Sequence, residues 1–492
     1  MGKQNDERPS VDDGEEKVGL KANLNLFGGV MLGVGCIIGS GIFVSTKGVH
    51  ENAGSVGLSL IIWLLCGVFS ALGAYCYAEL GTLITQSGGD YAYVYVAFGK
   101  FMAFVRLWIE CIIIRQDQTC LLPCTLAAVA IIFAQYVLQP FFSCSSPGFA
   151  LQAAAACCLV TLSLVNAFSS RLTTMIQNVF TIGKLAALAL IILTGFYLLA
   201  TKESSELEAF SNIFDGPPVT FGKLSIAFYA GLWSFNGWNY ITIVTEELKN
   251  PTRNLPLSIG LSCLICTVVY TLANLAFYAG VSLTEIVESE AVAVTFAEHH
   301  YGFLAPIMPL CVAMSCFGTV NGVLLTSSRL FYVGARENQM PNILSMINPY
   351  TGTPMPSVFF IMILSMGYLT MSDNIYSLIN SIQIVNWIAV AMAVAGLLYL
   401  RIKMPVKDHP RPVKVNLIVP VIFLTGCVFL IAVPIYQEFK DSMVGLALLL
   451  TSLPVYYLFI HRKNSSSIDN AMGKFTQACQ KIMLVVGEDK LK

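Results

Sequence analysis

Long apolar segments without a polar face constrain this sequence more than any other feature. Residues 150–165 and 185–199 are apolar on every side of a helix, whereas the helices of a soluble domain carry a polar face. Of the 492 residues, 56% are hydrophobic and 12% are charged, against roughly 25% charged in an ordinary soluble domain. The sequence therefore predicts an all-α membrane protein whose main solvent is lipid.

A length of about 20 apolar residues per helix predicts twelve membrane spans. The third, from about Phe98 to Val137, has twice the usual length, and we keep it whole because no turn cluster divides it. The spans fill residues 24–461, between an N-terminal tail (1–23) and a C-terminal tail (462–492) with an amphipathic helix. The expected starts lie near Leu24, Ser55, Phe98, Phe149, Met175, Phe221, Leu255, Gly302, Pro356, Ile375, Val415 and Ser442.

The distribution of basic residues predicts the orientation of these spans. The first 23 residues have no apolar stretch of the kind that forms a signal peptide. With the N-terminus inside, the inner loops hold far more Lys and Arg than the outer loops, as the positive-inside rule requires. We therefore expect both termini in the cytoplasm.

Two of the predicted spans are interrupted by glycine. Span one contains Gly33, Gly35, Gly39 and Gly41, and span six contains the segment 230–239 with its own glycines. Glycine costs about 1 kcal/mol in a helix interior, and unwound backbone at membrane depth occurs only where it lines a cavity or is buried in protein. For span one alone, the alternative that glycine merely lets two helices pack closely stays open.

The positions of the interruptions favour a binding site. Spans one and six correspond to each other in two halves of five spans, which predicts a 5+5 inverted repeat with a site at the membrane midplane. The N–H groups of Ser40, Gly41 and Ile42 would begin a half-helix, where the dipole attracts a carboxylate. Carbonyl groups of residues 232–235 would attract an α-ammonium group. The pattern thus predicts a zwitterionic ligand.

Several motifs identify a family. They are Ile-Gly-Ser-Gly-Ile-Phe at 38–43, Cys-Tyr-Ala-Glu-Leu-Gly at 76–81, Ser-Gly-Gly-Asp-Tyr at 87–91, Gly-Trp-Asn at 237–239, Thr-Glu-Glu at 245–247, Ser-Cys-Phe-Gly at 315–318 and Ser-Ser-Arg-Leu-Phe at 327–331. This set closely resembles the light chains of heteromeric amino-acid transporters, the L-type amino-acid transporter branch of the amino acid–polyamine–organocation superfamily. The likeness spans roughly residues 24–485.

The resemblance implies a LeuT-like fold with broken helices one and six. It also implies sodium-independent exchange of neutral, mainly large L-amino acids across the plasma membrane. A single-span type II glycoprotein heavy chain is the expected partner, with membrane lipids around the spans.

The resemblance also implies roles for single residues. Ile38, Ser40 and Gly41 are expected to meet the substrate carboxylate, and Trp233 takes the place of the aromatic gate. Lys184 occupies the position where a fixed cation replaces the sodium ion of sodium-coupled relatives. The full expected set of substrate-binding residues is Ile38, Gly39, Ser40, Gly41, Ile42, Gln118, Trp233, Asn236, Asn239 and Asn386.

Three departures from the family pattern alter the expected pocket wall. Residues 115–118 read Arg-Gln-Asp-Gln, where neutral exchangers carry Arg-Pro-Ser-Ser, and Asn236 precedes Gly237 where relatives have a glycine pair. Trp233 replaces the phenylalanine of many relatives, which leaves the preferred size of the substrate side chain open.

Charged residues inside or beside the spans need partners, because insertion of a charge costs about 2.5 to 3.5 kcal/mol. We expect Lys184 to serve transport, while Glu110 and Arg115 serve either transport or internal pairing. A second group of charges, Glu246, Glu247 and Arg253, is expected to form a salt-bridge cluster at the inner mouth.

Cys144 lies in the predicted outward loop 139–147, and the predicted outward loops contain no second cysteine with which it could pair. In an oxidising compartment such a thiol is available to another chain, and the family places its disulfide to the heavy chain here. Cys144 is therefore the expected interchain cysteine.

Other classes of function lack a motif. The five histidines are scattered, so no metal site is predicted, and no Walker motif, catalytic nucleophile set or cofactor motif is present. A net charge of -1 gives no reason to expect nucleic acid. Two alternatives to a neutral exchanger stay open, namely an exchanger of cationic plus neutral amino acids, favoured by Asp117, and a non-transporting amino-acid sensor.

Overall fold

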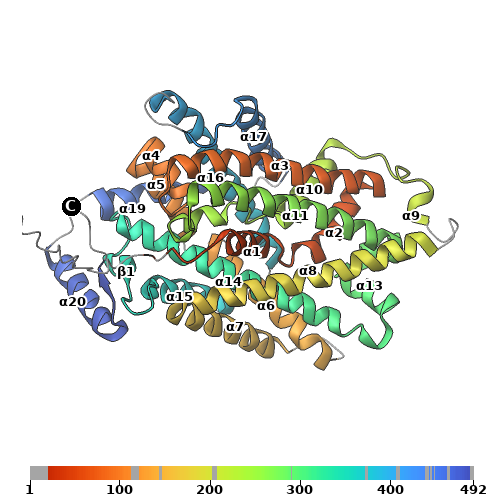
Figure 1. Cartoon of the computed structure of the whole chain (residues 1–492), viewed down its shortest axis with the longest axis horizontal. Coiled ribbons are helices and arrows are strands. Elements are labelled where there is room, and N and C mark those ends of the chain that lie inside the picture. Colours follow the sequence, from red (N-terminus) through yellow and green to blue (C-terminus); the bar gives the residue numbers. More distant parts are fainter. Residues whose placement is uncertain are drawn as a thin grey trace, which may run out of the picture.

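The computed structural model describes residues 20, 22–111, 121–142, 147–201, 208–289, 291–371, 375–405, 411–437, 443, 446–447, 449–461 and 466–487. Long helices run side by side along the longest axis of the molecule, and shorter elements gather at its two ends (Figure 1). The predicted site residues Gln118 and Cys144, and the departures Arg115 and Asp117, lie outside the described residues.

The described chain is almost entirely helical, with one pair of two-residue strands. The α-helices are α1 (Leu26–Ile37), α2 (Gly41–Ala53), α3 (Val56–Leu83), α4 (Asp90–Phe98), α5 (Lys100–Cys111), α6 (Leu121–Leu138), α7 (Gly148–Phe168), α8 (Ser170–Thr201), α9 (Glu208–Ser211), α10 (Phe221–Ser234), α11 (Pro251–Gly280), α12 (Leu283–Glu288), α13 (Val292–His300), α14 (Ile307–Arg336), α15 (Met355–Met371), α16 (Ile375–Lys403), α17 (Ile418–Gln437), α19 (Ser452–Val455) and α20 (Ser466–Met483). The remaining elements are the 3₁₀ helices η1 (Gln139–Phe141), η2 (Tyr240–Glu247), η3 (Gly302–Leu304) and η4 (Asn342–Ser345), the π-helix η5 (Tyr456–His461), and the antiparallel strands β1 (Met346–Ile347) and β2 (Val486–Gly487).

Six helices of the described chain are long and apolar enough to cross a membrane, and α1 with α2 makes a seventh if this bent pair is one span. The six involve α3, α7, α8, α11, α14 and α16. Three further apolar helices, within α6, α15 and α17, are shorter. The molecule is thus a helical, multi-pass membrane protein, whereas the count of twelve spans and the 5+5 repeat stay predictions.

Both predicted interruptions are present. The chain bends by 46° between α1 and α2, where Ile38 is extended and ends the first helix. In the sixth predicted span, α10 ends at Ser234 and the 3₁₀ turn η2 begins at Tyr240, with turns between them. The glycine pattern therefore identified both breaks from the sequence.

The broken helix α1 lies inside the bundle, where it packs against α8, α11 and α14 (Figure 1). Helices α8 and α11 approach each other closely at Gly195. A Cβ atom added to this glycine would lie only 2.5 Å from the Cα atom of Ala276. Helix α10 packs against α2 and α3, so the two broken spans are neighbours.

Charged side chains are paired at the end of the molecule that carries β1 and α20. Glu79 at the end of α3 is buried and forms ion pairs with Arg401 and Arg411. The backbone N–H of Val415 donates to the same carboxylate at 2.9 Å. Burial of a carboxylate is tolerated because its oxygens accept several hydrogen bonds.

The predicted amphipathic helix of the C-terminal tail is α20, which crosses the direction of the long helices at this end (Figure 1). Cys479 and Met483 pack against an apolar cluster formed by the ends of α7, α14 and α15 with η4. The strand β2 then pairs with β1. The tail is thereby fastened to the bundle.

Short elements lie at the opposite end, among them α9 and α13 (Figure 1), and α12 directly precedes α13 in the chain. Ser282 and Glu285 form a capping box that begins α12. The hydroxyl and backbone N–H of Ser282 donate to the Glu285 carboxylate and hold its pKa below the usual value.

Candidate substrate site at the two helix breaks

A cavity of about 50 Å³ lies where the two broken spans meet. Its wall is formed by α1, α2, α6, α10, η2 and α14. The breaks supply polar backbone and side-chain groups, and α6 and α14 each supply one threonine and one valine. The lining residues are Cys36, Ile37, Gly39, Ser40, Gly41, Thr125, Val129, Trp233, Ser234, Asn236, Tyr240, Thr319 and Val323.

One side of the cavity is the beginning of a helix. Because α2 begins at Gly41, the N–H groups of Ser40, Gly41 and Ile42 have no acceptor within the helix, whereas that of Phe43 donates to the Ser40 carbonyl at 3.1 Å. Ser40 and Gly41 line the cavity together with Gly39, whose own N–H donates to the Ile37 carbonyl at 2.9 Å. This side therefore presents backbone donors and the positive end of the helix dipole.

The other side is the end of α10, where the structure differs from the expectation of free carbonyl groups. The carbonyl of Leu232 accepts from the N–H of Phe235 at 3.2 Å, and that of Trp233 accepts from the N–H of Asn236 at 3.1 Å. The turn that ends the helix thus uses these oxygens. Each carbonyl oxygen keeps a second lone pair for a ligand.

Tyr270 on α11 connects the two breaks. Its buried hydroxyl lies 3.0 Å from the carbonyl oxygen of Ile37 at the end of α1, and 3.0 Å from that of Ser234 at the end of α10. The hydroxyl has one proton, so it donates to one oxygen at a time. A single tyrosine in an apolar span gave no sequence signal for this role.

Close packing also occurs at the breaks, as the alternative interpretation required. A Cβ atom on Gly41 would lie 2.7 Å from the Cα atom of Ser234, so α2 and α10 touch through their backbones. Gly237 has a φ of +98°, a backbone conformation that favours glycine. A Cβ atom added at this position would lie 3.1 Å from the Cys36 carbonyl oxygen. Packing and cavity formation therefore coexist.

Lys184 on α8 is buried, with 1% of its surface exposed, and its ammonium group reaches the break of α1. The Nζ atom donates to the carbonyl oxygens of Gly35 at 2.9 Å and Ser315 at 3.1 Å, and also to that of Ile38. The hydroxyl of Thr319 lies 3.2 Å away. A cation thus occupies a cage of oxygen atoms beside the cavity.

The structure brings five of the predicted substrate-binding residues together in the cavity wall, namely Gly39, Ser40, Gly41, Trp233 and Asn236. The side chains of Ile38 and Ile42 are fully buried instead, and those of Asn239 and Asn386 do not line the cavity. Thr319 and Tyr240, which the sequence did not single out, do line it. Gln118 lies outside the described residues.

Asn239 contacts a buried charge cluster. Its side-chain amide lies 3.3 Å from an Asp90 carboxylate oxygen, and Arg106 lies 3.3 Å from the same oxygen. Arg106 also forms an ion pair with Glu110, one turn further along α5. Internal pairing, one of the two alternatives for Glu110, is therefore present, and the opposite charges at positions 106 and 110 are the sequence signal for it.

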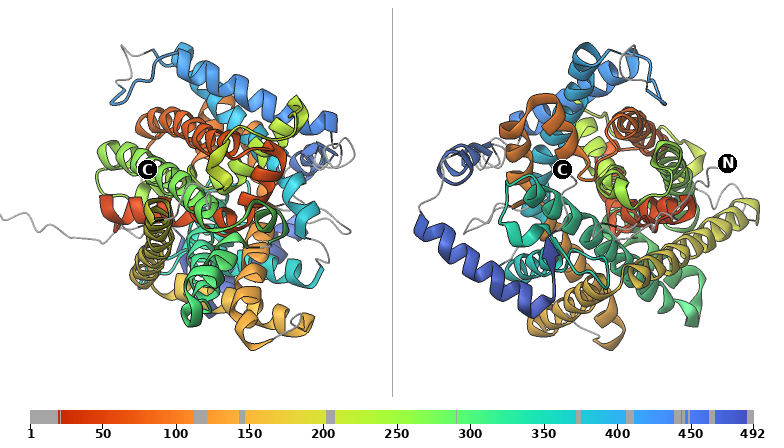
Figure 2. Two further views of the ribbon diagram at one scale, coloured as in Figure 1. Left: turned by 90° about the vertical axis from the view of Figure 1, so that its right-hand side faces the viewer. Right: turned by 60° about the vertical axis from the view of Figure 1, so that its left-hand side comes forward.

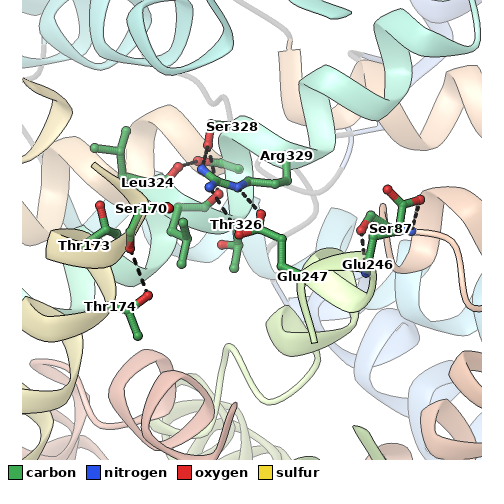
Figure 3. Close-up of polar contacts among 12 residues, drawn as sticks. Ser87, Ser170, Thr173, Thr174, Glu246, Glu247, Leu324, Thr326, Ser328 and Arg329 are labelled. Carbon is green, nitrogen blue, oxygen red and sulfur yellow. Dashed lines mark hydrogen bonds and ion pairs between the residues drawn. The ribbon is translucent and has the colours of Figure 1, made fainter. Parts of the chain in front are cut away.

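A second charge cluster ties η2 to α14, as Figure 3 shows. Glu247 and Arg329 form a buried ion pair, with an Nε–Oε1 distance of 2.6 Å. Glu246 forms an ion pair with Arg336 at 2.9 Å. The sequence correctly predicted a salt-bridge cluster with these two carboxylates, but among the described ion pairs their partners are Arg329 and Arg336 and not Arg253.

Hydrogen bonds that involve the backbone also hold η2 to neighbouring segments. The N–H of Ser87 donates to the Glu246 carboxylate at 3.1 Å, and the Ser87 hydroxyl accepts from the N–H of Glu246 at 3.0 Å (Figure 3). The N–H of Leu24 donates to the carbonyl of Glu247 at 2.9 Å. The segments before α1 and after α3 are therefore held to η2.

Apolar spans, two broken helices and a cavity at the breaks define a membrane protein of the transporter class. The chain matches the family model of amino acid permeases over residues 24–460. It is 43% identical over 490 residues to the large neutral amino acids transporter small subunit 2 of Oryctolagus cuniculus, covering 99% of this chain and 89% of that protein.

Two other relatives have similar coverage. The cystine/glutamate transporter of Homo sapiens is 40% identical over 498 residues, covering 100% of this chain and 97% of that protein. The Asc-type amino acid transporter 1 of Mus musculus is 40% identical over 473 residues, covering 96% and 87%. The chain belongs to the amino acid permease family, and the resemblance to light chains of heteromeric transporters is confirmed.

We predict that Tyr270→Phe slows amino-acid uptake without lowering the amount of folded protein. The change removes the hydroxyl beside the carbonyls of Ile37 and Ser234, worth about 1 kcal/mol as a hydrogen bond, and keeps the ring that packs against Trp63 and Phe235. Uptake per folded molecule in proteoliposomes measures the effect.

The matched control is Tyr278→Phe on the same helix. It removes a buried hydroxyl that contacts His50 and Ser59, away from the breaks. Equal loss in both variants would contradict a specific role for Tyr270.

Proposed function

We propose that this chain is a sodium-independent exchanger of neutral, mainly large L-amino acids that works by alternating access. On this proposal it acts in the plasma membrane, with both termini cytoplasmic, as the light chain of a disulfide-linked heterodimer. The observation that carries the proposal is the cavity shared by the start of α2 and the end of α10. The relative named as a large neutral amino acids transporter small subunit adds support.

The two sides of the cavity match the two charges of an amino acid. The start of α2 supplies N–H donors for a carboxylate at Ser40 and Gly41, whereas the N–H of Gly39 already donates to the Ile37 carbonyl at 2.9 Å. The carbonyl oxygens at the end of α10 have lone pairs for an ammonium group, after a local rearrangement of the turn at Phe235 and Asn236.

The rest of the wall favours an uncharged substrate side chain. Among the described residues that line the cavity, none has a charged side chain, and Val129, Trp233 and Val323 are apolar. An unpaired charge on the substrate would lose its hydration without gaining an ion pair. This counts against cationic and acidic substrates, although Asp117 and Gln118 lie outside the described residues.

Alternating access is supported by the small cavity and by the ion pairs that hold η2 to α14. A volume of about 50 Å³ is far below the roughly 300–1,000 Å³ of pockets for drug-sized ligands. A large amino acid therefore requires movement of the wall, with Trp233 as the proposed gate. On this proposal, the ion pairs of Glu246 and Glu247 with α14 form a gate that must separate for release of the substrate on that side.

An exchanger and a sensor differ in flux and not in binding. We predict that proteoliposomes loaded with leucine take up labelled leucine, and that empty ones take up much less, because an exchanger needs a substrate on both sides. Inhibition of leucine uptake by added lysine tests the alternative that the chain exchanges cationic as well as neutral amino acids. Binding of leucine without flux would instead identify a sensor.

The same assay tests the carboxylate site. We predict that Ser40→Val abolishes most leucine exchange, because its branched side chain crowds the backbone donors beside the cavity. The matched control is Ser45→Val, a buried serine of α2 that does not line the cavity. Undiminished exchange by the Ser40 variant would rule out the carboxylate assignment.

Lys184 is the proposed replacement for a sodium ion. We predict unchanged uptake when choline replaces sodium, and strongly reduced uptake by Lys184→Met in either salt. The variant removes the ammonium donor from the carbonyl oxygens at the α1 break and leaves the Ser315 and Thr319 hydroxyls as their side-chain donors. One hydroxyl proton cannot serve several oxygens at once, and each buried group left unsatisfied costs about 1–3 kcal/mol. Lys223→Met, at an exposed position of α10, is the control. A strict requirement for sodium in the unchanged protein would refute the proposal.

Cys144 is the proposed link to the heavy chain. Disulfides require Cα atoms within roughly 4.4–6.8 Å, so the partner must already dock beside this loop. We predict that Cys144→Ser removes the high-mass band on non-reducing gels but preserves much of the non-covalent complex and its transport. Identical migration of the co-expressed wild-type protein with and without reductant would show that no such disulfide forms.

A further inference from the structure

A second cavity, of about 220 Å³, lies at the seam between α3, α10 and α17. Figures 1 and 2 show α17 at the edge of the bundle. The wall is apolar apart from Ser225, whose hydroxyl donates to the Phe221 carbonyl at 2.9 Å and so offers no free proton. The lining residues are Phe69, Phe221, Leu224, Ser225, Phe228, Leu232, Gly426, Phe429 and Leu430.

The surroundings of this cavity face lipid. Large apolar side chains on the same three helices are exposed, among them Val68, Phe221 and Val428, with 46%, 70% and 57% of their surface accessible. In a multi-pass membrane protein such a surface contacts the hydrocarbon of the bilayer. A molecule that enters this cavity therefore comes from the membrane.

Water is a poor occupant, because a buried water needs two to four polar partners and this wall supplies almost none. An empty cavity would forfeit the dispersion contacts of its aromatic lining. The volume lies below the roughly 300–1,000 Å³ of pockets for drug-sized ligands, which favours a slim, flexible chain over a rigid fused-ring sterol. We propose that an acyl chain of a membrane phospholipid occupies this cavity.

The site is coupled to the substrate cavity through a single helix. Leu232 lines the apolar cavity, and the next residue, Trp233, lines the cavity at the breaks. Among the described elements, α10 is the one that lines both cavities. An acyl chain wedged between α10 and α17 therefore contacts the helix that carries the proposed gate, so that its presence alters the movement of α10.

The test uses the whole chain, with its partner where one is required, in nanodiscs that contain phosphatidylcholine with a diazirine in one acyl chain. After irradiation, mass spectrometry locates the labelled residues. We expect saturable labelling of the cavity segments of α10 and α17. The exposed apolar face of α8, at Leu193 and Tyr197, should show only weaker labelling that rises in proportion to the probe.

Two pairs of variants make the test specific. Leu224→Trp and Leu430→Trp fill the cavity from α10 and from α17. Ile226→Trp and Val428→Trp add the same side chain at exposed positions of these helices that do not line it. We expect several-fold loss of cavity labelling in the first two variants and retention in the controls.

Three results would overturn the proposal. They are equal, non-saturable labelling of every lipid-facing helix, undiminished labelling of both filled variants in folded form, and labelling of the cavity by a diazirine sterol but not by the phospholipid. The readout is the position of the label and not transport, so a failed exchange assay would leave this test intact.

Discussion

The contact between the Lys184 ammonium group and the break of α1 is the interaction on which the rest of the site depends. A broken helix inside a membrane exposes carbonyl oxygens that neither lipid nor the helix can satisfy. Lys184 supplies donors to Gly35 and Ile38 on α1, and also to Ser315 on α14. The ammonium group thus stabilises the unwound backbone and fastens it to α8 and α14. Lys184 does not line the cavity itself, so the wall at the α1 break is held by contacts on its far side.

The second break depends on different chemistry. Its carbonyls are used within the turn that ends α10 and by the Tyr270 hydroxyl, which also reaches the end of α1. Beyond the turn, η2 is fixed by the ion pair between Glu247 and Arg329. A buried ion pair adds little net stability but costs several kcal/mol when one partner is lost. Such pairs are suited to holding one of two alternative arrangements rather than to stabilising the fold as a whole.

Sequence patterns predicted those features that depend on local backbone chemistry. Glycines at membrane depth identified both breaks, and a lysine in an apolar span identified the buried cation. The directions of side chains were harder to predict, because they depend on tertiary neighbours. The contact of the Asn239 amide with Asp90, which the α3–α4 connection brings close, was not predicted, and the contact of Asn239 with substrate stays a prediction. Arg253 was expected in the inner cluster for its position in sequence, whereas Arg329 reaches Glu247 from α14.

Backbone groups and side chains have separate tasks in the proposed site, and this separation is consistent with the different amino acids for which the relatives are named. Relatives at 40–44% identity are named for large neutral amino acids, for cystine and glutamate, and for Asc-type transport. Under the proposed function, the N–H groups at the start of α2 and the carbonyls at the end of α10 recognise the carboxylate and ammonium that all amino acids share. Substitutions at Val129, Trp233, Asn236 or Val323 then alter only the space and polarity offered to the substrate side chain. A backbone-built site of this kind tolerates a change of substrate without loss of the breaks that create it.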